Sequence, residues 1–400
     1  MLSQAPFRVQ NMIPYGRQTI SDEDIAAVVA VLKSDFLTQG PAVPQFEQSI
    51  ANYCGAKYAV AVNSATSALH IACLALGVKE GDYVWTTPNT FVASANCARY
   101  CGAKIDFVDI DPLTFNLSPE KLEEKLKQAE QKGCLPKVVI PVHFSGLSCD
   151  MEKIYALSKQ YNFKIIEDAS HAIGGRYQDT IIGCGKYSDI TVFSFHPVKI
   201  ITTAEGGMAV TNDPELATQM QLYRSHGITR DADQLLEESH GPWYYEQQQL
   251  GFNYRMTELQ AALGTTQLTH LDEWVARRHE LAHRYDALLA DLPVILPQHS
   301  GRDYSGLHLY VIQLDESRTS LDRKFIFGEL RRLGIGVNVH YIPVHTQPDF
   351  QALGFKWGDF PHSEYYYKRC ISLPLYATLT DAQQDQVVNT LSQILTGIAQ

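Results

Sequence analysis

One lysine has the sequence setting of a reactive amine. Lys199 lies in the run 193–207, after a short apolar strand and before a Gly-Gly turn, flanked by proline, apolar and β-branched residues. Most lysines are solvated on helix faces. An amine in apolar surroundings loses hydration as a cation, so its pKa falls and it becomes a nucleophile toward a carbonyl. Lys199 is therefore a candidate for Schiff-base chemistry.

An acid at the end of a predicted strand could act with this lysine. A pyridine-aldehyde cofactor needs a lysine, an acid at the ring nitrogen, an anion site for its phosphate and a group against the ring face. Asp168 follows the apolar strand predicted near 163–166, where open α/β sheets place ligand contacts. It could equally be a helix N-cap. Glu167 is the competing acid, but strand alternation directs it to the opposite side.

The anion site and the ring contacts have candidates as well. Residues 63–67, Asn-Ser-Ala-Thr-Ser, precede a predicted helix, whose free N–H groups and dipole suit a phosphate. Ser194, five residues before Lys199, could add a hydroxyl from the adjoining strand. Phe91 could lie on one ring face and His171 could approach the other. Ser and Thr are also common caps, and a single Phe or His is usually a core residue.

Composition limits the class of protein. The chain has 400 residues and a formal net charge of −11, which disfavours nucleic acid as a partner. Its eight cysteines are scattered without CxxC spacing, so small buried thiols are expected rather than a metal site. The start has no basic segment followed by an apolar one, and no apolar run is long enough to span a membrane. We therefore expect a reduced, cytoplasmic setting with no membrane contact.

The order of predicted elements indicates an α/β fold with two domains. From about Ser21, helical and strand patterns alternate, as in a mostly parallel sheet covered by helices. A long helical stretch is predicted from Met256 to about Leu289, and a smaller α+β part follows, with strands near 308–312 and 337–341. We expect a large domain over 1–255 and a long helix with a small C-terminal domain over 256–400. The polar, aromatic segment 229–249 reads as a long functional loop.

Five motifs in this order make the sequence recognisable. They are Asn63 to Leu69, Glu167 to Ala172, Phe193 to Gly207, Arg224 to Gly227, and Gly251 to Met256. With them, the chain resembles the DegT/DnrJ/EryC1/StrS family of pyridoxal-phosphate sugar aminotransferases over essentially its whole length. The resemblance implies fold type I, the aspartate aminotransferase-like architecture.

The resemblance also implies roles for single residues. Lys199 would anchor the pyridoxal 5'-phosphate and shuttle a proton, and Asp168 would face the pyridine nitrogen. Ala65, Thr66 and Ser194 would hold the phosphate. Asn253 would reach the phosphate of a neighbouring subunit, so a homodimer with the site at the subunit interface is implied. Some relatives carry histidine in place of the lysine and catalyse dehydration, so the lysine here favours transamination.

Further motifs imply the substrate class. Histidine at position 171 is frequent in relatives that aminate C4 of the sugar. The segments 34–41, 201–207 and 339–345 resemble relatives that transfer the amino group of L-glutamate to a UDP-linked 4-keto-6-deoxy-N-acetylhexosamine. By that resemblance, the nucleotide-sugar pocket is lined by Tyr15, Phe36, Leu37, Thr38, Asn338, His340 and Tyr341.

Three alternatives stay open. Residues 338–341 could be an ordinary strand and turn. The chain could be another C4 aminotransferase, acting on a 4-keto-arabinose or a D-configured 4-keto hexose. It could also be a non-catalytic protein that binds sugar nucleotides and has kept the fold.

Overall fold

The larger part of the molecule is built on one seven-stranded sheet. The structure is a computed structural model that describes residues 12–298 and 303–397. The start of the chain, on which the expectation of no export signal rests, lies outside these residues. The strand order is β1-β9-β8-β5-β4-β2-β3, and all strands except β9 run in one direction. The strands are β1 (Tyr58–Val62), β2 (Tyr83–Thr86), β3 (Lys104–Phe107), β4 (Val138–Ile140), β5 (Lys164–Asp168), β8 (Ile190–Ser194) and β9 (Gly207–Thr211).

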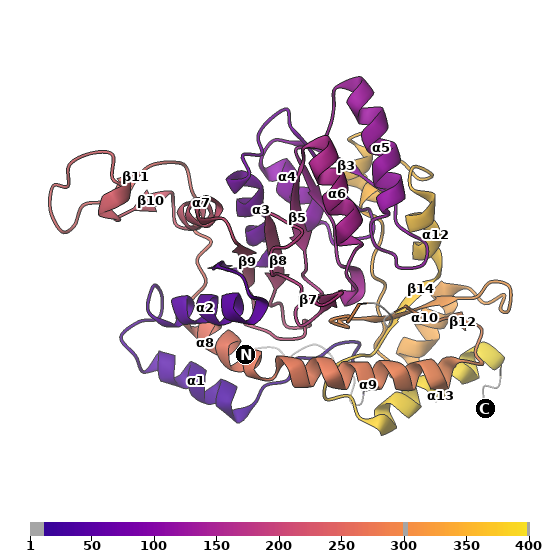
Figure 1. The fold of residues 1–400 in the computed structure, drawn as a ribbon. Coiled ribbons are helices and arrows are strands. Elements are labelled where there is room, and N and C mark those ends of the chain that lie inside the picture. The colour runs from indigo at the N-terminus through magenta and orange to yellow at the C-terminus, as the bar shows by residue number, and fades with distance from the viewer. Residues whose placement is uncertain (1–11, 299–302, 398–400) are drawn as a thin grey trace, which may run out of the picture.

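Helices cover both faces of this sheet (Figure 1). Alternate residues of β1 belong to different cores: Val60 and Val62 pack with α3, while Ala59 and Ala61 pack with α2. One face carries α3 (Ala65–Ala75), α4 (Ala93–Tyr100) and α7 (Pro214–Arg224). The other carries α2 (Ala42–Cys54), α5 (Pro119–Lys132), α6 (Met151–Tyr161) and α8 (Glu258–Thr269). The expected mostly parallel sheet covered by helices is confirmed.

Local sequence signals fix several helix starts. Ser21 and Asp24 form a capping box at α1 (Asp22–Leu32), as the sequence predicts. The helical stretch predicted from Met256 to about Leu289 is present, but it is divided into α8 and α9 (Leu271–Leu289) and is not one long helix. His270 ends the first helix and begins the second, and its ring stacks on Trp274 one turn later, at 5.2 Å between centroids.

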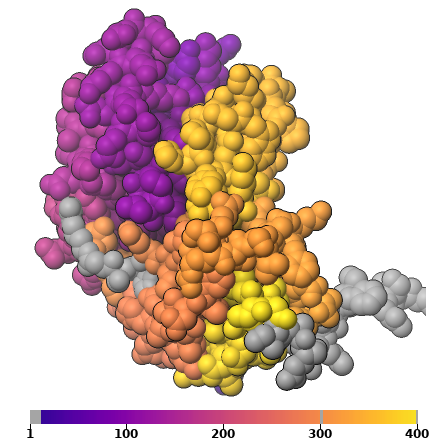
Figure 2. Space-filling view, turned by 90° about the vertical axis from the view of Figure 1, so that its right-hand side faces the viewer, coloured from indigo at the N-terminus to yellow at the C-terminus, as the bar shows by residue number. Residues whose placement is uncertain are grey.

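The C-terminal segments form a second layer beside the large sheet (Figure 2). A three-stranded antiparallel sheet of β12 (Val294–Ile295), β13 (Tyr310–Leu314) and β14 (Cys370–Leu373) packs with α9, α10 (Arg323–Arg332) and α13 (Asp381–Thr396). Ile13 joins this core and pairs with Ile335. The N-terminal segment therefore lies on the C-terminal layer, and the division at residue 255 stays a prediction.

One predicted strand is absent from this layer. Among the described residues 337–341, only Asn338 makes a bridge, to Ser372 of β14. Beyond it the chain turns toward the large sheet, where Val344 and Phe350 pack into the core beneath α4. The short elements here are the 3-10 helix Val344–Thr346, α11 (Pro348–Gln351) and α12 (Pro361–Arg369). Contact with the large sheet has replaced strand pairing.

Two hairpins leave the main layers. β6 (Arg176–Tyr177) and β7 (Thr180–Ile181) form a small one, and a 3-10 turn lies at Phe144–Gly146. The segment predicted as the loop 229–249 forms a second hairpin of β10 (Ile228–Thr229) and β11 (Glu246–Gln247), with the 3-10 turn Ala232–Gln234 between them. This hairpin extends far from the body (Figure 1). The exposed apolar side chains of this segment are Leu236, Trp243 and Tyr245, and the exposed Leu250 follows directly after it.

The described residues bear on two further expectations. None of their helices is long and apolar enough to cross a membrane. All eight cysteines are free thiols, and five of them are buried.

The contact between β9 and α3 yields a stability prediction. A Cβ on Gly207 would lie 2.5 Å from the backbone of Ser64 and Ala65. We expect Gly207→Ala to lower the free energy of unfolding by about 1–3 kcal/mol, because rigid backbone would have to move. Gly328→Ala in α10 is the control, since its Cβ would meet nothing within 4 Å. The control should gain about 0.5–1 kcal/mol from helix propensity. Calorimetry of the ligand-free proteins measures both, and equal unfolding temperatures would refute the expected clash.

Candidate active site

The cavity of interest lies where the carboxyl ends of the parallel strands meet. It has a volume of about 960 Å³. Strand ends and the loops that follow them supply Asn63, Val142, Asp168 and Ser194. Open α/β sheets bind ligands at this edge. The remaining lining residues are Tyr15, Ser64, Ala65, Thr66, Ser67, Leu69, Thr90, Phe91, Ala93, Ser94, Ser170, His171, His196, Val198, Lys199, Glu205, Gln260, Asn338, Val339, His340 and Tyr341.

Lys199 projects into this cavity from the turn between β8 and β9. Its backbone N–H donates to the carbonyl of His196 at 2.9 Å, which closes a tight turn after Pro197. Burial lowers the pKa of the amine to about 8, although the nearby carboxylate of Asp168 acts in the opposite direction. At pH 7 the amine is therefore still mostly a cation, but roughly a tenth of it is uncharged, far more than for a free lysine. The nucleophilic amine predicted from the sequence has the expected surroundings.

Asp168 ends β5 and is buried at the floor of the cavity. One carboxylate oxygen accepts from the Ser94 hydroxyl at 2.6 Å, and the other accepts from the backbone N–H of Ser170 at 3.1 Å. No helix starts at Asp168, so it is not an N-cap. Each carboxylate oxygen still has a lone pair for a ligand.

Glu167 points to the opposite side of β5, as strand alternation predicts. Its carboxylate lies 2.7 Å from His143 Nε2 and accepts from the hydroxyls of Ser188 and Thr191. His143 Nδ1 accepts from the backbone N–H of Cys149, so the ring proton on Nε2 goes to Glu167. Of these two neighbouring acids, only Asp168 lines the cavity.

The start of α3 faces the same cavity. Ser64 is the N-cap, and its hydroxyl accepts from the Ser67 N–H at 3.1 Å. The first intrahelical bond is that of Ala68 to the Ser64 carbonyl, so Ala65 and Thr66 stand before the helical ladder begins. Because Gly207 has no side chain, β9 lies directly against Ser64 and Ala65. Together with buried Ser194, these groups suit a dianion.

His171 forms the wall beside Asp168. Its Nδ1 lies 3.2 Å from the backbone nitrogen of Ser145, and its Nε2 lies 3.0 Å from the Tyr341 hydroxyl. The rings of His171 and Tyr341 are nearly parallel, and the His308 ring lies 4.4 Å away between centroids. Burial, with the charge of Lys199, holds the pKa of His171 well below its usual range.

His340 and Asn338 line the cavity next to Tyr341. His340 Nδ1 lies 2.7 Å from the Ser372 hydroxyl, and its Nε2 lies 3.4 Å from the Asn338 side-chain nitrogen. Burial and the charge of Lys199 lower the pKa of His340 to about 3. The Tyr15 ring lies 5.6 Å from the His340 ring, so the N-terminal segment completes this part of the cavity.

The structure brings most of the expected residues together, but not all. Phe91 stands at the rim with 59% of its surface exposed. Phe36, Leu37, Thr38 and Asn253 are exposed and do not line the cavity formed by the described residues of this chain. Leu37 is nevertheless tied to the start of α8, since its carbonyl accepts from the Glu258 N–H at 3.1 Å.

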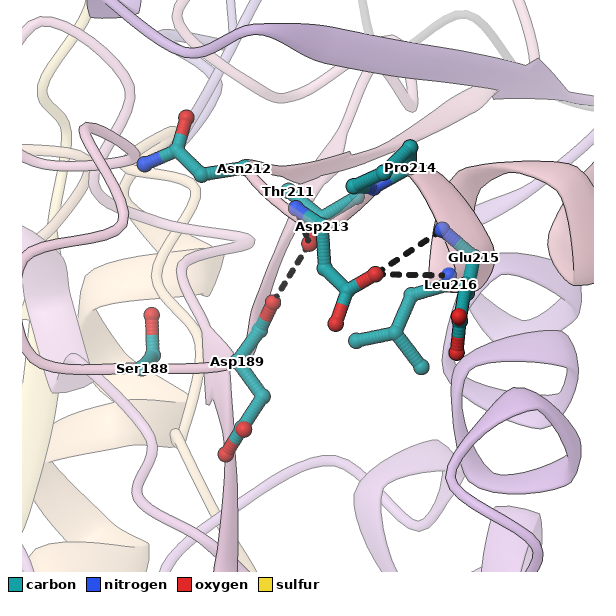
Figure 3. A pocket seen from close by; sticks show the side chains of 8 residues that line it. All are labelled: Ser188, Asp189, Thr211, Asn212, Asp213, Pro214, Glu215 and Leu216. Atoms are coloured by element: carbon teal, nitrogen blue, oxygen red, sulfur yellow. Dashed lines mark hydrogen bonds between the residues drawn. The ribbon is translucent and has the colours of Figure 1, made fainter.

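A second hollow lies at the opposite edge of the sheet and lacks comparable chemistry. It surrounds the end of β9 and the start of α7, and Figure 3 shows its lining residues, Ser188, Asp189, Thr211, Asn212, Asp213, Pro214, Glu215 and Leu216. The Asp213 carboxylate accepts from the N–H groups of Glu215 and Leu216. The N–H groups at this helix start are thus already bonded to a carboxylate, which disfavours a further anion there.

Comparison with known proteins identifies the family. The profile described as the DegT/DnrJ/EryC1/StrS aminotransferase family matches residues 18–392. The chain belongs to this family. It is therefore an enzyme, a transaminase that uses pyridoxal 5'-phosphate, and fold type I is confirmed.

Relatives match this DegT-family chain along nearly its full length. Spore coat polysaccharide biosynthesis protein SpsC of Bacillus subtilis is 40% identical over 97% of this chain and 98% of its own. The structure of Helicobacter pylori PseC, an aminotransferase involved in the biosynthesis of pseudoaminic acid, has a TM-score of 0.87 with 32% identity over 96% and 100%. The PLP form of putative sugar aminotransferase Spr1654 from Streptococcus pneumoniae has a TM-score of 0.87 with 29% identity over 97% and 100%.

The cavity fits the cofactor of the DegT family. The missing Cβ of Gly207 leaves a cradle at the start of α3 that suits the phosphate. Asp168 is an ionisable acid held by Ser94, and Lys199 supplies the amine. When bound, pyridoxal 5'-phosphate supplies an electron sink for the bond that breaks beside the amino group.

Three contributions were not predicted from the sequence. Ser94 holds Asp168, Ser145 holds His171, and Gln260 donates to the Glu205 carbonyl at 2.8 Å on the rim. Ser94 and Ser145 act across 74 and 26 residues of sequence. A local sequence pattern cannot predict such contacts.

The lowered pKa of Lys199 yields a pH prediction. The uncharged amine is the form that attacks an aldehyde, so the rate of pyridoxal phosphate attachment to the cofactor-free protein should rise with pH, with a midpoint near 8. In Asp168→Asn the midpoint should move to lower pH, because the carboxylate that favours the cation is gone. Stopped-flow absorbance measures the rate. A midpoint near that of free lysine, or a shift upward in Asp168→Asn, would contradict this assignment.

Proposed function

We propose that this enzyme transfers the amino group of L-glutamate to C4 of a UDP-linked 4-keto-6-deoxy-N-acetylhexosamine. The product would be UDP-4-amino-4,6-dideoxy-N-acetyl-β-L-altrosamine, an intermediate of pseudaminic acid biosynthesis. The observation that carries the proposal is the juxtaposition, in one cavity, of Lys199, Asp168 and the start of α3 with a polar wall at Asn338 and His340. The likeness to PseC over almost the whole of both chains supports the sugar class.

Each group has a role set by its surroundings. In the half-reaction with the amino donor, the uncharged amine of Lys199 would take a proton from the donor's α-carbon. In the half-reaction with the sugar, the protonated amine would deliver a proton to the sugar carbon from the face on which Lys199 lies. Asp168, held by Ser94, would favour a protonated ring nitrogen of the bound cofactor. The imidazoles of His171 and His340 are neutral, so they can hydrogen-bond to uncharged sugar oxygens and add no positive charge beside Lys199.

A second candidate within the family has a specific observation in its favour. Identity to SpsC, at 40%, exceeds the 32% identity to PseC. The sugar could therefore be another nucleotide-linked 4-keto sugar, including a D-configured hexose or 4-keto-arabinose. A panel of such sugars, with mass spectrometry and NMR of the product, separates these substrates by mass and by the configuration at C4. The cytoplasmic setting stays a prediction.

The catalytic proposal is tested at Lys199. We expect Lys199→Ala to lose the visible absorption of the bound cofactor and to reduce glutamate-dependent amination by at least about 1,000-fold, because it removes both the anchor and the proton carrier. Lys186→Ala is the control, since Lys186 is exposed on the turn before β8. Full turnover by Lys199→Ala would refute the assignment. Cofactor retained by the wild-type enzyme without turnover of any keto sugar would favour the non-catalytic alternative.

We also propose that the working unit is a homodimer. Ile25, Val29 and Leu32 form an apolar stripe along the exposed side of α1, while buried Asp24 attaches the helix to α8. The extended hairpin exposes Trp243, Leu250 is exposed just after it, and Asn253 follows without reaching the cavity of its own chain. A second copy would cover the apolar side chains and bring Asn253 to the phosphate.

The dimer proposal is tested by a charge on α1. Val29→Glu should weaken the dimer by at least about 100-fold, because it buries an unpaired carboxylate in the interface. Leu113→Glu, at a position with 61% exposure, is the control. Sedimentation at several concentrations measures the change. Mixing Lys199→Ala with Asn253→Ala enzymes should restore activity through mixed dimers, and a failure to complement would contradict a shared site.

A further inference from the structure

We propose that Tyr341 presents its hydroxyl proton to an oxygen of the bound sugar, because Ser145 and Tyr341 together hold His171 as the neutral tautomer protonated at Nε2. Tyr341 would thus be a specificity residue, and Ser145 and His171 would be its positioning residues. The nature of the ligand rests on the proposed function. The assignment of the His171 tautomer depends only on hydrogen bonds within this chain.

The Ser145 backbone determines which nitrogen of His171 is unprotonated. Ser145 has φ 60° and ψ −1°, and in this conformation its N–H points at Nδ1 from 3.2 Å. The turn is fixed by two further bonds, from the Ser145 hydroxyl to the Leu309 carbonyl at 2.6 Å and from the His308 N–H to the Ser145 carbonyl at 2.9 Å. A backbone N–H can only donate, so Nδ1 accepts and carries no proton.

The groups around His171 disfavour a second proton on the ring. Lys199 faces it from the turn after β8 and His340 from the position before Tyr341, and both act against a cation on His171, as does burial. His308 packs on its other side, with the buried guanidinium of Arg278 behind it. The Asp168 carboxylate in the floor is the opposing charge, and Ser94 and Ser170 already hydrogen-bond to it. The ring is therefore neutral, and its proton is on Nε2.

Tyr341 must then accept rather than donate at His171. The Nε2–H of His171 donates to the tyrosine oxygen at 3.0 Å, so the hydroxyl hydrogen points elsewhere. Within the described residues, the structure records no other hydrogen bond of this hydroxyl. Burial and the charge of Asp168 raise the pKa of Tyr341, so the proton stays on the oxygen at neutral pH. A buried donor without an acceptor is costly, and a ligand oxygen would remove that cost.

Two polar residues just before Tyr341 in the chain also line the cavity. The side-chain oxygen Oδ1 of Asn338 accepts from the Val339 N–H at 2.8 Å. The other end of the same amide, the nitrogen Nδ2, therefore faces His340 Nε2. His340 Nε2 therefore accepts, and its Nδ1–H donates to Ser372. Asn338 and His340 line the same cavity as Ser194 and the start of α3. On the basis of the proposed function, we assign the acceptor of the Tyr341 proton to an oxygen of the sugar.

The tautomer is tested by NMR on the cofactor-free enzyme. Protein labelled with ¹⁵N at histidine gives the protonation of each ring nitrogen through long-range ¹H–¹⁵N correlations, and His171→Gln assigns the resonances. We expect Nδ1 to be unprotonated and Nε2 to be protonated from pH 6 to 8. A proton on Nδ1, or a doubly protonated ring at pH 7, would overturn the proposal.

The role of the hydroxyl is tested by Tyr341→Phe. The KM for the keto sugar should rise about five- to tenfold, which is the effect of losing one hydrogen bond to a neutral acceptor. The single-turnover rate with glutamate should stay within about twofold of the wild type, since that step does not use the hydroxyl. Tyr285→Phe, which loses a hydroxyl bonded to the Pro374 carbonyl in the C-terminal core, is the control and should leave the KM unchanged.

The outcomes separate this proposal from the proposed function. An unchanged KM in Tyr341→Phe would overturn the donor role even if amination is confirmed. If the wild type aminates no keto sugar, the proposed function and the sugar as acceptor fall together. The NMR result still decides whether His171 is held as described.

Discussion

The parallel direction of β1, β4, β5 and β8 is the constraint on which the cavity depends. Their carboxyl ends meet at one edge, so residues far apart in sequence reach a common space. β9 is antiparallel and starts at that edge, where Gly207 packs on the backbone of Ser64 and Ala65. A side chain there would separate the strand from the helix start. The distance between the anion site and Lys199 is thus set by the packing of backbone on backbone.

Burial shapes the electrostatics of the cavity more than charge pairing does. Lys199 has one carboxylate nearby, yet its pKa falls. The imidazoles of His171, His308 and His340 have lowered pKa values in the same cluster, and two cations, Lys199 and Arg278, lie among them. Arg278 donates to the backbone carbonyls of Leu307, His308 and Leu375, and burial lowers its pKa to about 10. Neutral imidazoles can line a site that already holds positive charge, and lysines at those positions could not.

The sequence predicted the parts of the site that have a local signature. Lys199 and Asp168 stand at strand ends, and residues 63–67 precede a helix, so alternation and capping patterns locate them. The family resemblance added Tyr341 and His340, although the strand predicted for them does not form. Ser94 and Ser145 could not be found in this way, because their partners are chosen by tertiary packing. The break at His270 could not be predicted either, because no proline or glycine separates α8 from α9.

Helix α1 is attached to its domain through a buried polar side chain, whereas most helices are attached through buried apolar ones. Asp24 is its one buried residue, and it is held by Thr266 and Gln267 of α8 and by the N–H of Ser21. Apolar contacts tolerate sliding, whereas hydrogen bonds to a single carboxylate do not. A rotation of α1 by one residue would turn Asp24 away from Thr266 and Gln267, so these hydrogen bonds select one rotational setting of the helix. The direction in which Ile25, Val29 and Leu32 face is therefore fixed by a polar anchor on an adjacent face of the helix.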